Sequence, residues 1–172
     1  APPAHYNKDF MRIALGQINP TIGDLKANSD RMVRFAENAA AQNADIIAFP
    51  ELSLTGYPPR DLVEKTSFID RTLDALHELT IRTAKLPLAI IAGYVERATV
   101  PAGKAVWNSA AVIRHGRILF NQHKSLLPTY DVFDEARYFV PGEHGTLFTL
   151  GDTHVALTIC EDAWNDRTFW KQ

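Results

Sequence analysis

Short apolar runs and a helical repeat alternate in the first third of the chain. Residues 12–18 and 44–49 are apolar and rich in β-prone side chains, and turn-forming residues close the first run. Between these runs, apolar residues recur at helical spacing from Asp24 to about residue 42, and Asp24 or Asn28 can cap the helix. This order of strand, helix and strand predicts a βαβ unit with two parallel strands.

The pattern continues with a second helix and further strands. Apolar residues share one helical face from Phe68 to Thr80, and residues 88–95 form the next buried strand. Two hairpins follow: residues 107–113 with 117–121 about a two-residue turn at His115 and Gly116, and residues 146–150 with 153–159 about a turn at Gly151 and Asp152. Because hairpin strands are antiparallel whereas the βαβ strands are parallel, the sequence predicts an α/β fold with mixed sheets.

The composition is that of one globular domain, with 172 residues, 46% hydrophobic and 22% charged. Residues 1–10 show no periodicity and are expected to form a flexible leader before a single domain at 11–172. The formal net charge of -2, without long charged runs, argues against nucleic-acid binding, and no apolar run is long enough to span a membrane. One cysteine cannot form an internal disulfide, so we expect a reducing, cytoplasmic location.

Three polar residues, Glu51, Lys124 and Cys160, each follow the end of a predicted strand. Strand ends that meet at one edge of an α/β sheet bring catalytic side chains together. A thiolate can attack an acyl carbon, a carboxylate can carry the thiol proton to a leaving amine, and an ammonium can stabilise the oxyanion. The charge of Lys124 would also favour the thiolate of Cys160. This trio therefore predicts amide cleavage.

Each of the three residues also has an ordinary structural interpretation. A lone cysteine often packs as a small hydrophobic residue, an acidic residue after a strand can cap the following loop, and a lysine is often solvated at the surface. The spacing of the residues does not decide between these interpretations and catalysis.

Three blocks of sequence surround these residues: PELSLTGYPPRDL around Glu51, HKSLLPTYDVFDEARYF around Lys124 and LTICEDAW around Cys160. In content and order they resemble the signature blocks of the nitrilase, or carbon-nitrogen hydrolase, superfamily. Within that superfamily, the GYPPRDL, LPTYDVFDEARYF and CEDAW runs are similar to the amino-terminal glutaminase domain of glutamine-dependent NAD synthetases. The resemblance implies an α-β-β-α sandwich with mixed sheets, truncated here at its C-terminal side.

The resemblance assigns a role to each catalytic candidate. Cys160 would be the nucleophile that forms a glutamyl thioester, Glu51 the general base and acid, and Lys124 the cation at the oxyanion. Glu135 matches the family's second glutamate, which helps to hold the charged cluster. The backbone N–H of Glu161, next to the nucleophile, would be a second oxyanion donor.

The resemblance also implies that three residues contact the substrate, L-glutamine. Tyr130 falls where the synthetase glutaminases contact glutamine, and Phe133 and Glu161 would line the same pocket. The competing interpretation of Phe133 is an aromatic ring packed in the core. The six histidines are scattered without ligand spacing, so we expect no metal in this domain.

The resemblance also implies partners outside residues 11–172. The ammonia would pass to a synthetase domain of the same polypeptide, which uses ATP and Mg²⁺ to amidate deamido-NAD, while the glutaminase domain needs no cofactor of its own. We expect homo-oligomers, since the superfamily packs its sandwiches against each other, and we expect the truncated domain to be inactive alone.

Three alternatives are open from the sequence. The chain could be a free-standing amidase or nitrilase that acts on another small amide. It could be a non-catalytic assembly domain of the same fold, although the intact Glu51, Lys124 and Cys160 argue against this. A papain-like hydrolase would need a histidine beside Cys160, and the nearest in sequence, His154, lies on the same predicted strand.

Overall fold

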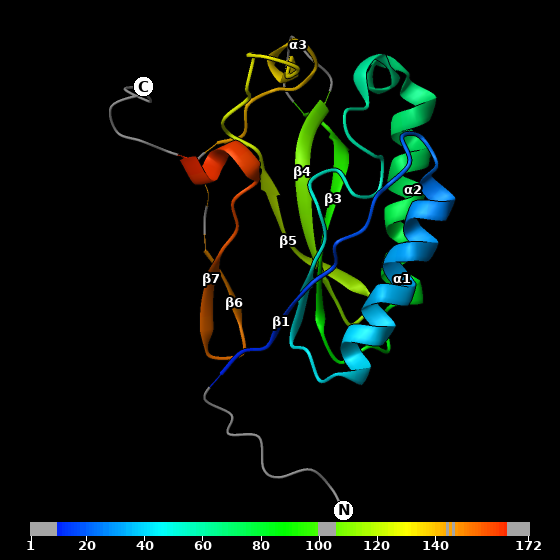
Figure 1. Cartoon of the computed structure of the whole chain (residues 1–172), viewed down its shortest axis with the longest axis vertical. Coiled ribbons are helices and arrows are strands. Elements are labelled where there is room, and N and C mark those ends of the chain that lie inside the picture. Colours follow the sequence, from blue (N-terminus) through cyan, green and yellow to red (C-terminus); the bar gives the residue numbers. More distant parts are fainter. Residues whose placement is uncertain (1–9, 100–105, 144, 146, 165–172) are drawn as a thin grey trace, which may run out of the picture.

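The computed structural model describes residues 10–99, 106–143, 145 and 147–164. Two helices cover one face of a five-stranded sheet, and a two-stranded sheet lies against its other face (Figure 1). In chain order the elements are β1 (Ile13–Leu15), α1 (Leu25–Ala41), β2 (Ile46–Ala48), η1 (Arg60–Glu64), α2 (Thr66–Arg82), β3 (Ala89–Arg97), β4 (Val106–Arg114), β5 (Arg117–His123), α3 (Glu135–Tyr138), β6 (Leu147–Leu150), β7 (Thr153–Ala156) and η2 (Cys160–Trp164). The predicted α/β class is confirmed.

The carboxyl ends of β2 and β5 lie at the same edge of the large sheet. Strands β1, β2 and β3 are parallel neighbours, with Ile13 opposite Ile46 and Ile46 opposite Ala89. Strand β4 is antiparallel to both β3 and β5, so β5 has the same direction as β2. Residues that follow β2 and β5 therefore emerge together, beside the beginning of β4.

Two hydrophobic cores hold the layers together. On the helix side, the fully buried Met32 of α1 packs in one cluster with Ile90 of β3. On the other side, Phe148 of β6 packs in a second cluster with the neighbouring Ile91. Strand β3 is thus buried on both faces, which explains why its sequence is a continuous apolar run rather than an alternating one.

The last predicted strand is shorter than its sequence suggests. Strand β7 ends at Ala156, not at residue 159, and Cys160 begins the short helix η2. Ile159 is 5% exposed in the core between the two sheets, and its N–H donates to the Asp162 carboxylate at 3.2 Å. The prediction that Cys160 directly follows a strand is therefore wrong, because the chain leaves the β6–β7 ladder to bury Ile159.

Parts of two predictions lie outside the described residues. Residues 1–9 of the expected leader are among these, and Phe10, which is described, is 85% exposed. Residues 165–172, the last part of the domain predicted at 11–172, are also outside. No helix in the part of the chain that the structure covers is long and apolar enough to cross a membrane.

Candidate active site

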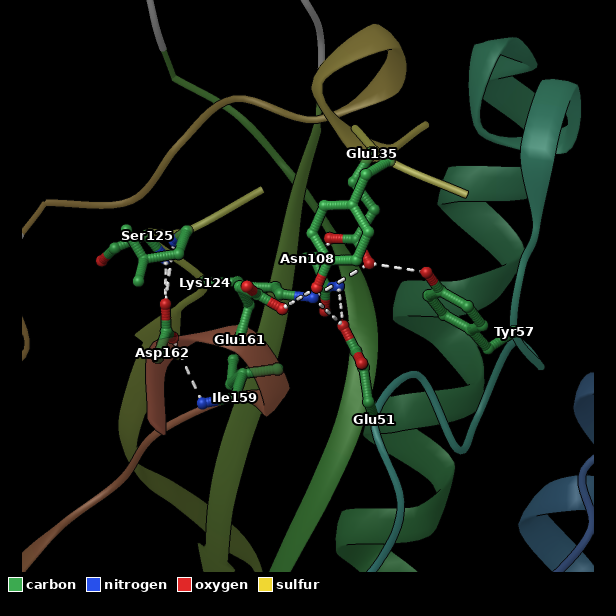
Figure 2. A network of polar contacts seen from close by, with 11 residues as sticks. Glu51, Tyr57, Asn108, Lys124, Ser125, Glu135, Ile159, Glu161 and Asp162 are labelled. Atoms are coloured by element: carbon green, nitrogen blue, oxygen red, sulfur yellow. Dashed lines mark hydrogen bonds and ion pairs between the residues drawn. The ribbon is translucent and has the colours of Figure 1, made fainter. Parts of the chain in front are cut away.

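Lys124 is the centre of a buried charged cluster. Its Nζ lies 2.7 Å from Oε1 of Glu51 and 2.9 Å from Oε1 of Glu135 (Figure 2). The lysine is fully buried. Burial alone would lower the pKa of Lys124, but the charges and hydrogen bonds of the two carboxylates outweigh it and raise that pKa. The residue is therefore a fixed ammonium rather than a solvated surface lysine.

Glu135, the matched second glutamate, begins α3 and is 4% exposed. Burial, followed by the negative charge of Glu51, raises the pKa of Glu135 against the opposing effects of Lys124 and Tyr57. The hydroxyl of Tyr57 donates a hydrogen bond of 2.8 Å to Oε1 of Glu135. Burial, and then this carboxylate, raises the pKa of Tyr57, so the phenol remains a neutral donor. Tyr57 was not among the predicted site residues, although it lies in the GYPPRDL run.

A turn that packs directly on β3 holds Glu51. The N–H of Leu54 donates to the carbonyl of Gly93 at 2.9 Å. A Cβ atom added to Gly93 would lie 2.3 Å from the backbone nitrogen of Leu52, so glycine is required for this close approach. The turn places Glu51 over the sheet edge, with its side chain 17% exposed. The interpretation of Glu51 as a simple loop cap does not account for its contact with a buried lysine.

Asn108 of β4 forms hydrogen bonds with both Glu51 and Lys124, and it was not among the predicted site residues. Its Nδ2 donates to Oε1 of Glu51 at 2.6 Å, and its carbonyl accepts a hydrogen bond of 2.8 Å from the N–H of Lys124. The side chain is 1% exposed, and its Oδ1 has no hydrogen-bond partner in the structure. The available signal was an amide in a strand that is otherwise mostly apolar.

Cys160 stands at the beginning of η2 with a backbone φ of 48°, in the left-handed region that non-glycine residues seldom adopt. The residue is exposed, and its thiol interacts with Glu51, Lys124 and Glu135. Partial burial of the sulfur, and then the charge of Glu51, raises the pKa of Cys160; Lys124 lowers it, but not enough to reverse the net effect. The predicted effect of Lys124, which favours the thiolate, is therefore present but is outweighed, and the resting group is a thiol that needs a base.

The three predicted substrate-contact residues lie next to one another. The hydroxyl of Tyr130 donates to Oε2 of Glu161 at 2.8 Å, and this hydrogen bond raises the pKa of Tyr130. The ring of Phe133 lies 5.7 Å from that of Tyr130, edge to face, and 6.2 Å from that of Tyr57. Because Tyr130 is 56% exposed and Phe133 is only half-buried, these side chains form an accessible surface rather than part of the core.

This arrangement contains the parts that amide hydrolysis needs. The accessible thiol has a carboxylate within hydrogen-bond reach and a fixed ammonium nearby. His154, by contrast, lies 3.2 Å from Oγ1 of Thr149 within its own hairpin, so a papain-like pair with Cys160 is not formed. Among the described residues, no group of three or more His, Cys, Asp or Glu side chains could hold a metal ion. The absence of a metal from the domain stays a prediction.

Residues 12–170 match the sequence model of the family named Carbon-nitrogen hydrolase. The chain belongs to the carbon-nitrogen hydrolase family. The curated relatives of this carbon-nitrogen hydrolase include the glutamine-dependent NAD(+) synthetase of Synechocystis sp., which is 44% identical over 165 residues. The match covers 93% of this chain but 29% of that protein, so the chain spans less than a third of its relative.

Solved structures share the fold of this carbon-nitrogen hydrolase. The glutamine-dependent NAD+ synthetase of Acinetobacter baumannii, in complex with ADP, superposes with a TM-score of 0.79 at 33% identity, over 94% of this chain and 30% of that one. A mutant of a nitrilase-superfamily amidase from Nesterenkonia sp. AN1 gives 0.72 at 25% identity, over 88% and 56%. That structure shows the acetamide moiety of fluoroacetamide added covalently at the active-site cysteine of the amidase. The predicted nitrilase-like fold is confirmed.

Proposed function

We propose that this chain is the glutaminase part of a glutamine-dependent NAD synthetase and hydrolyses L-glutamine to glutamate and ammonia. The observation that carries the proposal is the contact of buried Lys124 with the carboxylates of Glu51 and Glu135 beside the thiol of Cys160. The name of the Synechocystis relative, whose match extends over nearly the whole chain, supports the choice of substrate.

The first half-reaction forms a thioester. Glu51 accepts the proton of the Cys160 thiol as the sulfur attacks the side-chain amide carbon of glutamine, so that a C–S bond forms and the carbonyl electron pair moves to oxygen. The ammonium of Lys124 and the backbone N–H of Glu161 bind the resulting oxyanion. Glu51 then transfers its proton to the amide nitrogen, the C–N bond breaks, and ammonia leaves.

The second half-reaction regenerates the thiol. Glu51 accepts a proton from a water molecule, whose oxygen attacks the thioester carbon, and the C–S bond breaks. The departing sulfur recovers the proton through Glu51, and glutamate is released. Glu135 keeps Lys124 charged and oriented through both steps, so it supports the reaction without exchanging protons with the substrate.

Tyr130, Phe133 and Glu161 are the proposed contacts of the glutamine. The carboxylate of Glu161 suits the α-ammonium group of the substrate, and Tyr130 holds that carboxylate in place. Phe133, beside Tyr130, offers an apolar surface for the methylene groups of glutamine. The reacting amide would then lie over Cys160.

The wider activity of the protein is part of the same proposal. The domain at residues 11–172 would deliver ammonia to a synthetase domain of the same polypeptide, in which ATP and Mg²⁺ support the amidation of deamido-NAD. The glutaminase domain would need no cofactor. The exposed apolar side chains of Ile13 and Leu15 on β1, and of Leu147 on β6, offer surface for the proposed homo-oligomer.

A free-standing amidase is the second candidate, and its support is the structural likeness to the Nesterenkonia amidase. The two candidates share the thioester chemistry and differ in the substrate that protects the thiol. A non-catalytic assembly domain would show neither hydrolysis nor selective labelling of Cys160.

Mass spectrometry of the full-length protein tests the proposal. The protein and its Cys160→Ala variant are incubated with a diazoketone analogue of glutamine, with glutamine or acetamide as competitor. One adduct on Cys160, prevented by glutamine and absent from the variant, is expected, together with ammonia release from glutamine by the wild type. Protection by acetamide but not by glutamine would contradict the glutaminase and support the free-standing amidase. If Cys160 is not labelled in the folded protein, it is not the nucleophile.

A further inference from the structure

The carboxylate of Asp162 connects two segments of the candidate active site. Its Oδ1 accepts hydrogen bonds from the N–H groups of Ser125 at 3.1 Å and Leu126 at 2.8 Å, and its Oδ2 accepts from the N–H of Ile159 at 3.2 Å (Figure 2). Ser125 and Leu126 directly follow Lys124, and Ile159 directly precedes Cys160. One side chain thus joins the backbone beside the ammonium to the backbone beside the nucleophile.

Asp162 also closes a turn around Cys160. While its carboxylate accepts from the N–H of Ile159, its own N–H donates to the carbonyl of Ile159 at 3.1 Å. Cys160, with its φ of 48°, and Glu161 lie between the two residues that these bonds join. A non-glycine residue stays in this region when the surrounding structure holds it there. The two bonds fix the backbone on both sides of the strained residue and thereby the direction of its thiol.

The bonds to Ser125 and Leu126 then place this turn relative to Lys124. They span 37 and 36 residues of sequence, so they are tertiary contacts rather than local capping. Hydrogen bonds from neutral N–H groups to a carboxylate are about twice as strong as neutral pairs. Asp162 is half-buried and touches none of the groups that would react.

We propose that Asp162 is a positioning residue that holds the Cys160 turn against the Lys124 segment. The inference rests on the proposed function, because its consequence for turnover presumes that Cys160 is the nucleophile. Without the carboxylate, the thiol and the neighbouring Glu161 move away from Glu51 and Lys124, while Tyr130 and Phe133, which lie outside the turn, keep their places.

The test compares Asp162→Asn with the wild type in the full-length protein. The amide has nearly the same shape but one acceptor oxygen, and its NH₂ group cannot accept from a backbone N–H. We expect kcat for glutamine hydrolysis to fall by about 10- to 100-fold, and by a larger factor than KM rises, since misplacement of reacting groups costs rate. Asp152→Asn, in the exposed β6–β7 turn, is the matched control and should retain the wild-type kcat.

A second readout separates positioning from general destabilisation. The rate at which iodoacetamide alkylates Cys160 is measured against pH in both proteins. We expect the midpoint of the profile to move to lower pH in Asp162→Asn, toward the value of a free cysteine, because the thiol leaves the burial and the Glu51 charge that raise its pKa. A purely structural role would lower the melting temperature but would leave the profile of the folded protein unchanged.

The outcomes are distinct. An unchanged kcat, or a fall in kcat with an unchanged alkylation profile, would overturn the positioning role. Should Asp162→Asn fail to fold, Asp162→Ser, which keeps one acceptor and introduces no NH₂ group, is expected to give the same two shifts. If the wild type does not hydrolyse glutamine, the proposed function fails, while the alkylation profile still shows whether Asp162 positions Cys160.

Discussion

Asn108 Nδ2 lies 2.6 Å from Oε1 of Glu51, the same oxygen that Lys124 Nζ contacts at 2.7 Å. Two donors therefore converge on one carboxylate oxygen. Asn108 lies at the beginning of β4, and Lys124 directly follows β5. The orientation of the proposed base depends on an amide that takes no part in proton transfer.

Substitution Asn108→Asp is expected to lower kcat for glutamine hydrolysis by about 10- to 100-fold. The new carboxylate lacks the donor and places a like charge beside Glu51, so one of the two acids retains its proton. Steady-state kinetics measures the effect. The control is Ser109→Ala, because alternation along β4 directs Ser109, like Ala111, toward the helices. Equal losses of kcat in the two variants would show that the effect comes from disturbance of β4 rather than from Glu51.

Substitution Glu51→Gln is expected to have opposite effects on hydrolysis and on thiol alkylation. Hydrolysis should fall by about 10²- to 10⁴-fold through loss of the general base. Because Glu51 raises the pKa of Cys160, its neutralisation increases the thiolate fraction at pH 8, and iodoacetamide should react several-fold faster. The lower nucleophilicity of a more acidic thiolate offsets only part of this gain. Glu64→Gln, at an exposed position of η1, should change neither rate; slower alkylation of Glu51→Gln would contradict the prediction.

Substitution Lys124→Met is expected to destabilise the protein by about 3–5 kcal/mol at neutral pH, the usual result of removing one partner from a buried ion pair. The variant buries the carboxylates of Glu51 and Glu135 without their ammonium. The destabilisation should shrink in acid, where Glu135 takes up its proton. Urea unfolding at pH 4.5 and pH 7.5 measures both quantities. Lys26→Met removes an exposed helix pair with Asp30 and should leave the unfolding midpoint unchanged. Equal losses at the two pH values would contradict the role assigned to the carboxylates.

Substitution Glu135→Gln should change how stability depends on pH. The pKa of Glu135 is raised in the folded protein above its ordinary 4.5, so the folded state binds more protons than the unfolded state between the two values. The contribution of Glu135 to the unfolding free energy of the wild type therefore decreases as pH rises through this window. In Glu135→Gln that decrease is absent, and the variant's unfolding free energy relative to the wild type should increase with pH. Urea midpoints from pH 4 to pH 8 report the difference, and a constant offset would refute the shift.

The sequence predicted the parts of the fold that depend on local pattern. The hairpin turn at His115 and Gly116 and the helix capped by Asp24 are found as expected, because turn residues and helix caps act within a few positions. The convergence of Glu51 and Lys124 followed from the shared direction of strand ends.

The parts that were missed depend on contacts between layers. In the sequence, Asn108 is typical of a solvent-facing strand residue. In the structure, the turn that holds Glu51 packs over the same edge of the large sheet, and Asn108 contacts Glu51 there. Residues 157–159 are β-prone, yet the strand ends at Ala156, and Ile159 enters the core and donates its N–H to Asp162. The pKa of Cys160 is a balance between burial and opposing charges, which sequence spacing does not provide.

The order of the site residues along the chain has a consequence for synthesis on the ribosome. All three members of the charged cluster lie at or before Glu135, and the nucleophile follows roughly 25 residues later, which corresponds to about 1–5 s of translation. We expect the ammonium and its two carboxylates to pair first, so that the thiol enters a site whose charges are already neutralised. Protease protection of ribosome-bound chains stalled before and after Cys160 would reveal this order; if Lys124 and Glu135 became protected only after the cysteine had emerged, the order would be reversed.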